Sequence, residues 1–379
     1  MRYGLFFLLF LAIFLLNACK DSDPVEPTDQ DPNGEEALLE EFRDDEAPGV
    51  VKVMSRNVYV GTDVDVVLEA DNFNDIPVLV AEAFATLQQT NFAERAKILA
   101  NEIDKTRPHL IGLQEMAKIM RQTPSDFLSG NPVAASDTIY NYFTLFMDAL
   151  EAKGLNYKIA AWVKNADVEL PMFVGFDNQG NVKLDDIRLV DHDVILVRGD
   201  VEFSDPVTKN YAVNLPVDTT FGIYVDRGYA AVTAKIGAAS YRFVNTHLEA
   251  FDIEELRLAQ AAELALDLAA ESLPVIVAGD FNSVAPSGPT YQYFLGQGYT
   301  DTWDHNTLTY NEDGYTFGHQ ADLMNGTPSF AIRIDYIFLK SATEPTWGTG
   351  FVLGDELRDR LPSGMWPSDH GGVVIKFQF

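Results

Sequence analysis

Short runs of β-branched and other apolar residues recur from Val50 to the C-terminus, and turn residues bound most of them. This pattern is typical of β-strands, and several neighbouring runs are close enough to pair as hairpins. Stretches with apolar residues at helical spacing lie between the runs, as at residues 91–104 and 251–271. The pattern predicts an α/β (α+β) four-layer sandwich, in which two packed mixed or antiparallel β-sheets are flanked by helices, rather than a purely parallel doubly wound sheet.

The N-terminal segment has one basic residue, an apolar run from about Leu5 to Leu16, and then Leu16-Asn17-Ala18-Cys19. The run is short for a membrane span and has the build of a secretory signal. The last four residues resemble a bacterial lipobox, which implies a lipoprotein signal peptide over residues 1–18 and acylation of Cys19. The alternative is an ordinary signal peptide with an incidental cysteine. Because Cys19 is the only cysteine, the chain has no intramolecular disulfide.

An acidic segment follows the cysteine. Residues 20–50 contain twelve acidic residues against two basic ones, and four prolines. Such a composition buries too little apolar surface to fold, so we predict a disordered tether over residues 19–49 and a folded catalytic domain over residues 50–379. The Lys-Asp-Ser-Asp run after Cys19 resembles the export signal of some Bacteroidetes-type lipoproteins. We therefore expect a lipid anchor in a bacterial membrane, and we favour the outer membrane over the cytoplasmic one. Whether the anchored domain faces the periplasm or the outside of the cell stays open.

Polar residues stand at or beside the ends of the apolar runs. Each alone is more typical of a loop, but hydrolysis of a phosphoester needs a hard cation held by carboxylates, a base for water and donors to the phosphate. The set contains all three kinds of group. Its members are Asn57, Glu115, His247, Asp280, Asn282, Asp335 and the cluster Ser368-Asp369-His370.

Six segments in the same order resemble the motifs of the metal-dependent endonuclease/exonuclease/phosphatase superfamily, over about residues 50–379. This superfamily includes pancreatic-type deoxyribonucleases, abasic-site endonucleases, neutral sphingomyelinases and inositol polyphosphate 5-phosphatases. The resemblance implies an enzyme that hydrolyses phosphoesters with Mg²⁺ or Mn²⁺. The segments are SRNV at Asn57, IGLQE at Glu115, NTHLE at His247, GDFNS at Asp280, RIDYIF at Asp335 and SDH at Asp369.

The resemblance assigns a metal role to three residues. Glu115 would be the main carboxylate ligand of the Mg²⁺ or Mn²⁺ ion, with Asn57 beside it. Asp369 would lie near the ion, directly or through water. Oxygen ligands of this kind suit Mg²⁺, which keeps several waters and requires no cysteine or histidine cage.

Five further residues would act on the substrate. His370 would act on the nucleophilic water or the phosphate, and Asp335 would fix its tautomer. Asp280 and Asn282 would position the attacking water and a phosphate oxygen, and His247 would donate to the phosphate. Which histidine serves as the base stays open.

The chain departs from the family pattern at a few positions. Arg56 precedes Asn57 where the family often has tryptophan, and Tyr59 replaces a common acidic residue. His109 stands where an aspartate commonly follows the proline, and we expect it in a solvated turn. We expect His192 at the surface.

Charge bears on the substrate, because a net charge of −30 repels polyanions unless a metal or a basic patch intervenes. A nucleotide, sugar or inositol phosphate, or a lipid headgroup, is at least as well suited as nucleic acid, and both diesters and monoesters stay open. The segment at residues 169–176 is the nearest candidate for lipid contact. A catalytically silent surface binding protein is a further alternative, and no specific protein partner is implied. A local phosphate-binding patch could comprise Arg188, Arg198, Arg227, Arg242 and Arg333.

Overall fold

The computed structural model describes residues 34–379 except 69, 71, 130–131, 219–222, 251–252 and 309–312. The predicted signal peptide, Cys19 and most of the predicted tether lie outside these residues. No helix of the described part is long and apolar enough to cross a membrane.

One sheet of the described residues has ten strands, and its central strand β1 pairs parallel with β2 and antiparallel with β16. The sheet is therefore mixed. Its main order is β15 (Thr346–Leu353), β16 (Gly372–Gln378), β1 (Val50–Asn57), β2 (Leu110–Gln114), β6 (Val182–Arg198), β5 (Tyr157–Phe176), β9 (Ile223–Val225) and β8 (Leu215–Asp218), while β3 (Lys118–Gln122) pairs with β6 and with β4 (Asp137–Asn141).

The second sheet has six strands within the described residues and is also mixed, because β11 and β12 pair in parallel whereas β12 and β14 are antiparallel. Its order is β13 (Thr300–Asp301), β14 (Asp335–Lys340), β12 (Val275–Asp280), β11 (Ala239–His247), β10 (Gly228–Ile236) and β7 (Glu202–Asn210).

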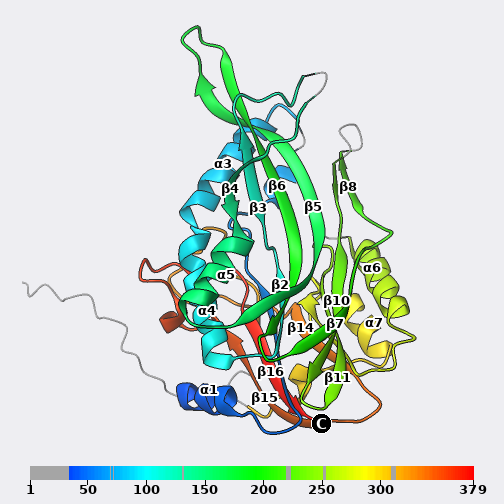
Figure 1. The fold of residues 1–379 in the computed structure, drawn as a ribbon. Helices are drawn as coiled ribbons and strands as arrows, with labels where there is room; N and C mark the ends of the chain where they lie inside the picture. The colour runs from blue at the N-terminus through cyan, green and yellow to red at the C-terminus, as the bar shows by residue number, and fades with distance from the viewer. Residues whose placement is uncertain are drawn as a thin grey trace, which may run out of the picture. The chain divides into compact units, whose positions relative to one another are not determined.

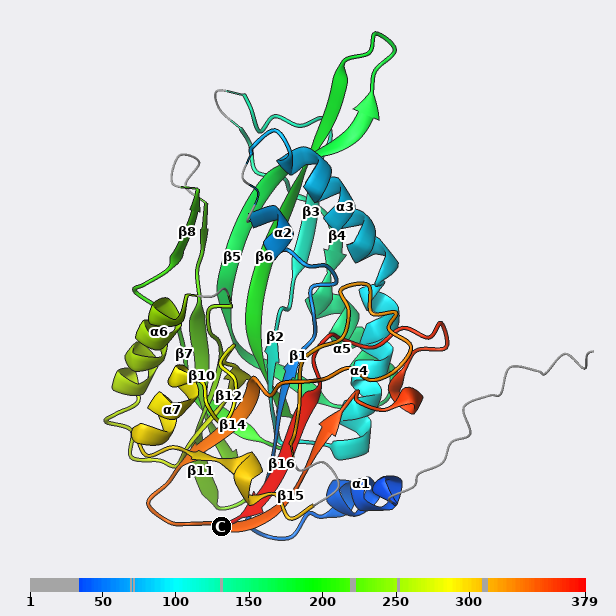
Figure 2. The ribbon, with the colours of Figure 1, turned by 180° about the vertical axis from the view of Figure 1, so that it is seen from behind.

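Helices cover the outer faces of both sheets, which gives the four predicted layers (Figures 1 and 2). The helices α1 (Glu35–Asp44), α3 (Ile76–Gln89), α4 (Phe92–Thr106) and α5 (Tyr142–Ala152) contribute buried side chains to the core on the outer face of the ten-stranded sheet. The helices α6 (Glu254–Asp267) and α7 (Pro289–Gly296) do the same for the six-stranded sheet. Three short helical segments complete the described elements: α2 (Asp65–Leu68), η1 (Thr302–His305) and η2 (Leu357–Asp359).

The central strands read as continuous apolar runs because both of their faces are buried. In β12, Ile276 and Ala278 point into the core between the sheets, whereas Val275 and Val277 point toward α6 and α7. This alternation follows from the two-residue period of a strand. The predicted fold class, with two packed sheets flanked by helices, is confirmed.

The tether prediction is wrong for its C-terminal part, since Glu35–Asp44 forms α1. Leu39 and Phe42 are buried, and the ring of Phe42 packs edge-on against Phe351 with 5.5 Å between centroids. The acidic residues next to the helix meet basic residues of the body: Nζ of Lys376 lies 2.7 Å from Asp45. An amphipathic face and paired charges therefore order a segment whose overall composition is that of a solvated linker.

The stretch at residues 164–186 forms part of a long hairpin of β5 and β6, whose tip extends beyond the other strands in Figure 1. The turn lies between Phe176 and Val182, where Asn178, Gly180 and Asn181 are residue types common in turns. Phe176 is 65% exposed at this tip. Residues 164–186 thus continue two strands of the core.

Candidate active site

Sheet register brings the predicted site residues to one end of the sandwich. In the ten-stranded sheet, Asn57 ends β1 opposite Gln114 of the parallel strand β2, so Glu115 follows directly beside it. In the six-stranded sheet, His247 of β11 lies opposite Asp280 of β12, which in turn lies opposite Asp335 of β14. The two sets of strand ends meet at the same end of the sandwich, because Asn57 of β1 contacts Asp280 of β12.

The side chain of Asn57 joins the two sheets. Its Nδ2 donates to Oε1 of Glu115 at 2.8 Å and to Oδ2 of Asp280 at 3.2 Å. Its Oδ1 accepts from the backbone N–H of Tyr59 at 2.9 Å, while Oε2 of Glu115 accepts from the N–H of Val60 at 2.7 Å. The first residues after β1 thus fix both the amide and the carboxylate.

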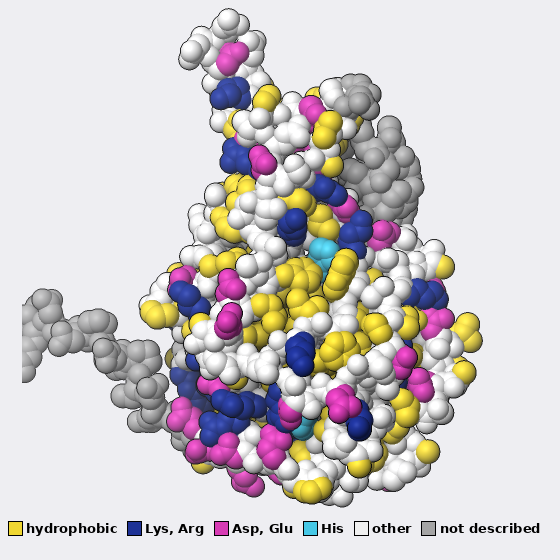
Figure 3. All heavy atoms as spheres, viewed as in Figure 1, with side chains coloured by type: hydrophobic (Ala, Val, Ile, Leu, Met, Phe, Trp, Pro, Cys, Tyr) yellow, Lys and Arg dark blue, Asp and Glu magenta, His cyan; other side chains and the backbone are white. Residues whose placement is uncertain are grey.

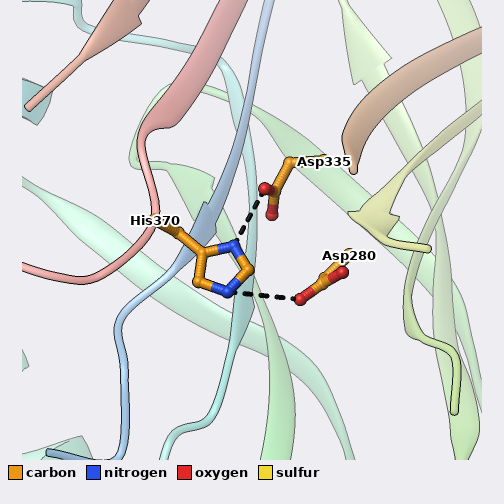
Figure 4. Close-up of side chains that lie close together, drawn as sticks. All are labelled: Asp280, Asp335 and His370. Atoms are coloured by element: carbon orange, nitrogen blue, oxygen red, sulfur yellow. Dashed lines mark hydrogen bonds and ion pairs between the residues drawn. The ribbon is translucent and has the colours of Figure 1, made fainter. Parts of the chain in front are cut away.

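The ring of His370 lies between two carboxylates (Figure 4). Its Nδ1 is 2.9 Å from Oδ2 of Asp335, and its Nε2 is 3.6 Å from Oδ2 of Asp280. A proton on Nδ1 is therefore held by Asp335, and Nε2 is directed toward Asp280. The structure places the predicted His–Asp pair within hydrogen-bond distance.

Opposing influences set the protonation of this cluster. Burial lowers the pKa of His370, but Asp335, Asp280 and Asp369 outweigh it and raise that pKa to about 10. Burial raises the pKa of Asp280 to about 7, with Asp335 adding to the effect. Burial likewise raises the pKa of Asp369 to about 7, and Glu115 contributes. The site thus holds more negative charge than its surroundings stabilise.

His247 has the opposite character. Burial, helped by Arg227 and His370, holds its pKa well below the usual value. Its Nε2 lies 3.1 Å from Nδ2 of Asn282, which also donates to the carbonyl of Leu248 at 3.0 Å. A neutral His247 accepting at Nε2 therefore fixes the orientation of the Asn282 amide, and Asn282 itself has a positive φ of 49°.

Six of the eight predicted site residues line a cavity of about 430 Å³, whereas Asn57 and Asp335 lie behind its wall; the six are Glu115, His247, Asp280, Asn282, Asp369 and His370. Among its described lining residues, Arg227 is the only lysine or arginine, and its Nη2 lies 3.4 Å from Oε1 of Glu249. The predicted arginine patch is wrong, because the other four guanidiniums bond elsewhere: Arg188 to Asp167, Arg198 to Glu46, Arg242 to the carbonyl of Asp205, and Arg333 to Asp301.

Two other sequence predictions are also wrong. His109 is buried, and its Nδ1 accepts from the backbone N–H of Lys52 at 3.0 Å, so it does not lie in a solvated turn. His192 is 9% exposed and packs edge-on against the rings of Phe143 and Trp162. In both cases the ring fills space between elements that are distant in sequence.

Buried arginines that sequence reasoning did not single out hold the loops of the site. Arg95 of α4 donates to the backbone carbonyls of Val58, Tyr59 and Pro367, which belong to the loops after β1 and before His370. Arg56, noted only as a departure from the family, forms a bidentate pair with Glu102 at 2.9 Å and donates to the carbonyl of His370.

A polar bridge below the site joins the sheets. Nδ2 of Asn245 donates to the carbonyl of Leu113 at 2.8 Å, and Oδ1 accepts from Gln114 at 2.7 Å. Gly112 permits this approach, since a Cβ there would lie 2.5 Å from Oδ1 of Asn245. Two sequence features indicate this bridge: a buried asparagine within the apolar strand β11, and a glycine in β2, the strand of the other sheet that faces it.

The donor set suits a hard divalent cation. Asp280, Asp335 and His370 each offer one ligand atom, all within 4.8 Å of one another, and Glu115 and Asp369 line the same cavity. Among the described residues, Oδ1 of Asp335 is buried without a hydrogen-bond partner. Asn57 joins Glu115 to this group through Asp280, and burial and crowding raise the pKa of Asp280 and of Asp369. A cation held at Glu115 would stabilise these crowded carboxylates.

Comparison with known proteins places the chain in a family. Residues 86–370 match the model of the Endonuclease/Exonuclease/phosphatase family. A probable CCR4-Not complex 3′-5′-exoribonuclease subunit Ccr4 of Enterocytozoon bieneusi (strain H348) is 33% identical over 126 residues, which represent 28% of this chain and 24% of that relative. The match therefore covers about a quarter of the curated relative.

Solved structures share the fold at low identity. A family protein from Leptotrichia buccalis C-1013-b has a TM-score of 0.51 and 17% identity, covering 87% of this chain and 100% of its own. A mannosyl-6-phosphatase of Bacteroides thetaiotaomicron VPI-5482 has a TM-score of 0.50 and 17% identity, with the same coverage. Since the family match spans most of the folded part and includes the strand ends from Glu115 to His370, the chain belongs to the endonuclease/exonuclease/phosphatase family of phosphoester hydrolases.

Proposed function

We propose that this protein hydrolyses phosphoesters with a divalent cation, Mg²⁺ or Mn²⁺, at the end of the sandwich where Asn57 joins Glu115 to Asp280. The observation that carries the proposal is this junction: one amide contacts carboxylates from both sheets, 3.5 Å from Nε2 of His370. A hydrolase needs its cation ligands, its water-positioning groups and its phosphate donors within one cavity.

Glu115 would hold the cation, with Asn57 beside it and Asp369 on the wall of the same cavity. When bound, the cation supplies positive charge that stabilises the negative charge developing on the phosphate. Carboxylate and amide oxygens match the preference of Mg²⁺ and Mn²⁺.

The protein's own groups position the water and the phosphate. Asp280 accepts a hydrogen bond from the attacking water, and the Asn282 amide, fixed by His247, orients it. His370, held through Nδ1 by Asp335, presents Nε2 as a donor to a phosphate oxygen. Arg227 lies on the cavity wall as a further cation for the ester.

The test measures hydrolysis of bis-p-nitrophenyl phosphate and p-nitrophenyl phosphate by the purified full chain with Mg²⁺, Mn²⁺ or EDTA. We expect metal-dependent turnover that Glu115→Gln and His370→Ala each reduce by at least about 100-fold. The exposed residues Glu94 and His305 provide matched controls, so Glu94→Gln and His305→Ala should keep full activity. Equal activity in EDTA, or in Glu115→Gln, would contradict the proposal.

Nucleic acid is the second candidate substrate, because the curated relative with 33% identity is named as an exoribonuclease. The charge distribution disfavours it. On the face shown in Figure 3, basic side chains alternate with acidic ones rather than forming a continuous stripe. A ribonuclease assay on a single-stranded oligonucleotide, run beside the nitrophenyl esters, separates the two candidates.

We also propose that Cys19 carries a lipid that anchors the chain to a bacterial membrane, the outer membrane in the first instance. The lipobox-like Leu16-Asn17-Ala18-Cys19 supports this proposal. Metabolic labelling with radioactive palmitate should label the wild-type chain but not Cys19→Ser. Unlabelled wild-type protein cleaved elsewhere would favour an ordinary signal peptide, and protease accessibility of intact cells would report the orientation of the anchor.

A further inference from the structure

The cavity at the candidate active site extends well beyond the polar residues. One end is lined by Glu115, Asp280 and His370, and the rest of its wall is largely apolar. Its volume of about 430 Å³ lies within the range of about 300–1,000 Å³ of cavities that bury small organic ligands. A phosphate group alone would occupy only the polar end.

The apolar wall is built by α3 and the strands that it covers. Val80, Phe84 and Leu87 recur at intervals of four and three residues, so they share one face of α3. Val168 and Leu170 are two positions apart on β5 and share a face of that strand. In Figure 2, α2 and α3 lie in front of the ten-stranded sheet, and α3 packs directly on β5.

These side chains belong to the core of the outer layer but also face the cavity. Each of the five is at most 9% exposed, so their positions are fixed by packing rather than by solvent. Ile119 of β3 and Leu189 of β6 continue the same wall. An apolar ligand that packs on this wall is stabilised by leaving water. Because the wall is already ordered, binding costs no conformational entropy of these side chains.

Charge limits what can occupy this space. Apart from Arg227 and His370, the charged side chains that line the cavity are acidic and include Asp63, Asp65 and Asp191. A substituent with further phosphates would meet these carboxylates, whereas an uncharged apolar substituent would not.

We propose that the site takes an amphiphilic phosphoester, with its phosphate at Glu115, Asp280 and His370 and its apolar substituent against α3 and β5. The proposal rests on the phosphoester hydrolase function proposed above and names the substrate class of the same site. An acyl, alkyl or prenyl chain has this chemistry, whether the ester is a free monomer or a lipid within a membrane.

The test compares the methyl, butyl and octyl esters of p-nitrophenyl phosphate as monomers with the full chain and its divalent cation. We expect kcat/KM to rise by about two- to fourfold per methylene that enters the cavity. A second arm uses a hexadecyl ester in phosphatidylcholine vesicles to distinguish a soluble substrate from a membrane lipid. A higher kcat/KM for the monomeric octyl ester would assign a soluble amphiphile. A higher kcat/KM for the vesicle-bound ester would assign a membrane lipid.

Two alanines of α3 provide a matched pair of variants. Ala83 lines the cavity, whereas Ala85 is exposed two positions further along the same helix. Ala83→Trp should lower the octyl-to-methyl ratio of kcat/KM by about tenfold, because the indole occupies the space of the chain. Ala85→Trp should keep the wild-type ratio.

A binding measurement without turnover complements the kinetics. Fluorescence of N-phenyl-1-naphthylamine should increase on mixing with the full chain in EDTA, octyl phosphate should reverse the increase, and Ala83→Trp should abolish it. Turnover of the methyl ester with no dependence on chain length, together with no probe fluorescence, would overturn the inference and leave the hydrolase function intact. Absence of turnover for every ester, with probe binding retained, would instead overturn the hydrolase function.

Discussion

Two carboxylates hold the imidazole of His370 from opposite nitrogens, and only one of them is near enough for a strong hydrogen bond. Asp335 bonds Nδ1 at 2.9 Å, whereas Asp280 lies 3.6 Å from Nε2. Asp335 therefore sets the tautomer, and Asp280, which accepts from Asn57 and from the N–H of Asn282, keeps further lone pairs for water or substrate. This asymmetry assigns different effects to the two carboxylates.

We predict that Asp335→Asn lowers kcat for bis-p-nitrophenyl phosphate by up to about 10²–10⁴-fold and changes KM little, since the ring loses its orientation while the cavity keeps its shape. Asp137 also begins a strand but is exposed, so Asp137→Asn is the matched control. Steady-state kinetics of both variants and the wild type measure the change in kcat. Equal midpoints of thermal unfolding would show that the two variants are folded alike. An unchanged kcat in Asp335→Asn would contradict the assigned role.

A second residue-scale prediction concerns stability at low pH. Burial, with help from Arg198 and Lys52, lowers the pKa of His109 to about 4. The folded protein thus binds the His109 proton more weakly than the unfolded chain, and its stability falls as pH drops from about 6.5 toward 4. Between pH 7 and pH 5 the loss attributable to His109 should be about 2 kcal/mol.

Urea unfolding at pH 7 and pH 5 measures this loss. His109→Gln keeps an acceptor for the Lys52 N–H but does not titrate, so the free energy of unfolding should depend less on pH in this variant than in the wild type. The exposed His305 gives the control, and His305→Gln should retain the wild-type dependence. Identical dependence in all three proteins would show that His109 is solvated in solution.

At the scale of elements, the predictable parts were those with local signals. The strands ending at Asn57 and Asp280 could be identified because a β-branched run is followed by polar residues. The helix α1 was missed because the composition of residues 19–49 concealed a short amphipathic face around Leu39 and Phe42. In α3, apolar residues recur at helical spacing from Val80 onward. Its contact with β5 joins residues about 80 positions apart, so no local pattern could predict it.

We predict that α1 contributes to stability as part of the core. Phe42→Ala should lower the free energy of unfolding by about 3–5 kcal/mol, because the ring is fully buried against Phe351. Phe176, which is 65% exposed at the hairpin tip, gives the control, and Phe176→Ala should change stability by less than about 0.5 kcal/mol. Equal urea midpoints for the two variants would show that α1 is detached in solution.

At the scale of the whole molecule, the candidate site depends on contacts that no local pattern records. The sequence indicated which strand ends carry chemistry, and sheet register accounts for the placement of Asp280 between His247 and Asp335. The role of Arg95 could not be predicted in this way, because its three carbonyl partners belong to two loops that are more than 300 residues apart in the sequence. The arginine patch failed for the same reason: pairing with carboxylates is decided by tertiary structure.

The charge of the whole molecule leads to a prediction about polyanions. Most of the net charge of −30 lies within residues 51–379, so the protein repels nucleic acid at long range and added salt screens that repulsion. Affinity for a fluorescent 20-nucleotide single-stranded DNA in EDTA should therefore stay flat or increase between 20 and 200 mM NaCl, as measured by anisotropy. A protein that binds through several phosphate contacts shows the opposite: its affinity for DNA falls by about 10³-fold or more over a similar range of salt concentration. Such a loss here would reveal a local basic track and favour a nuclease over a hydrolase of small or amphiphilic esters.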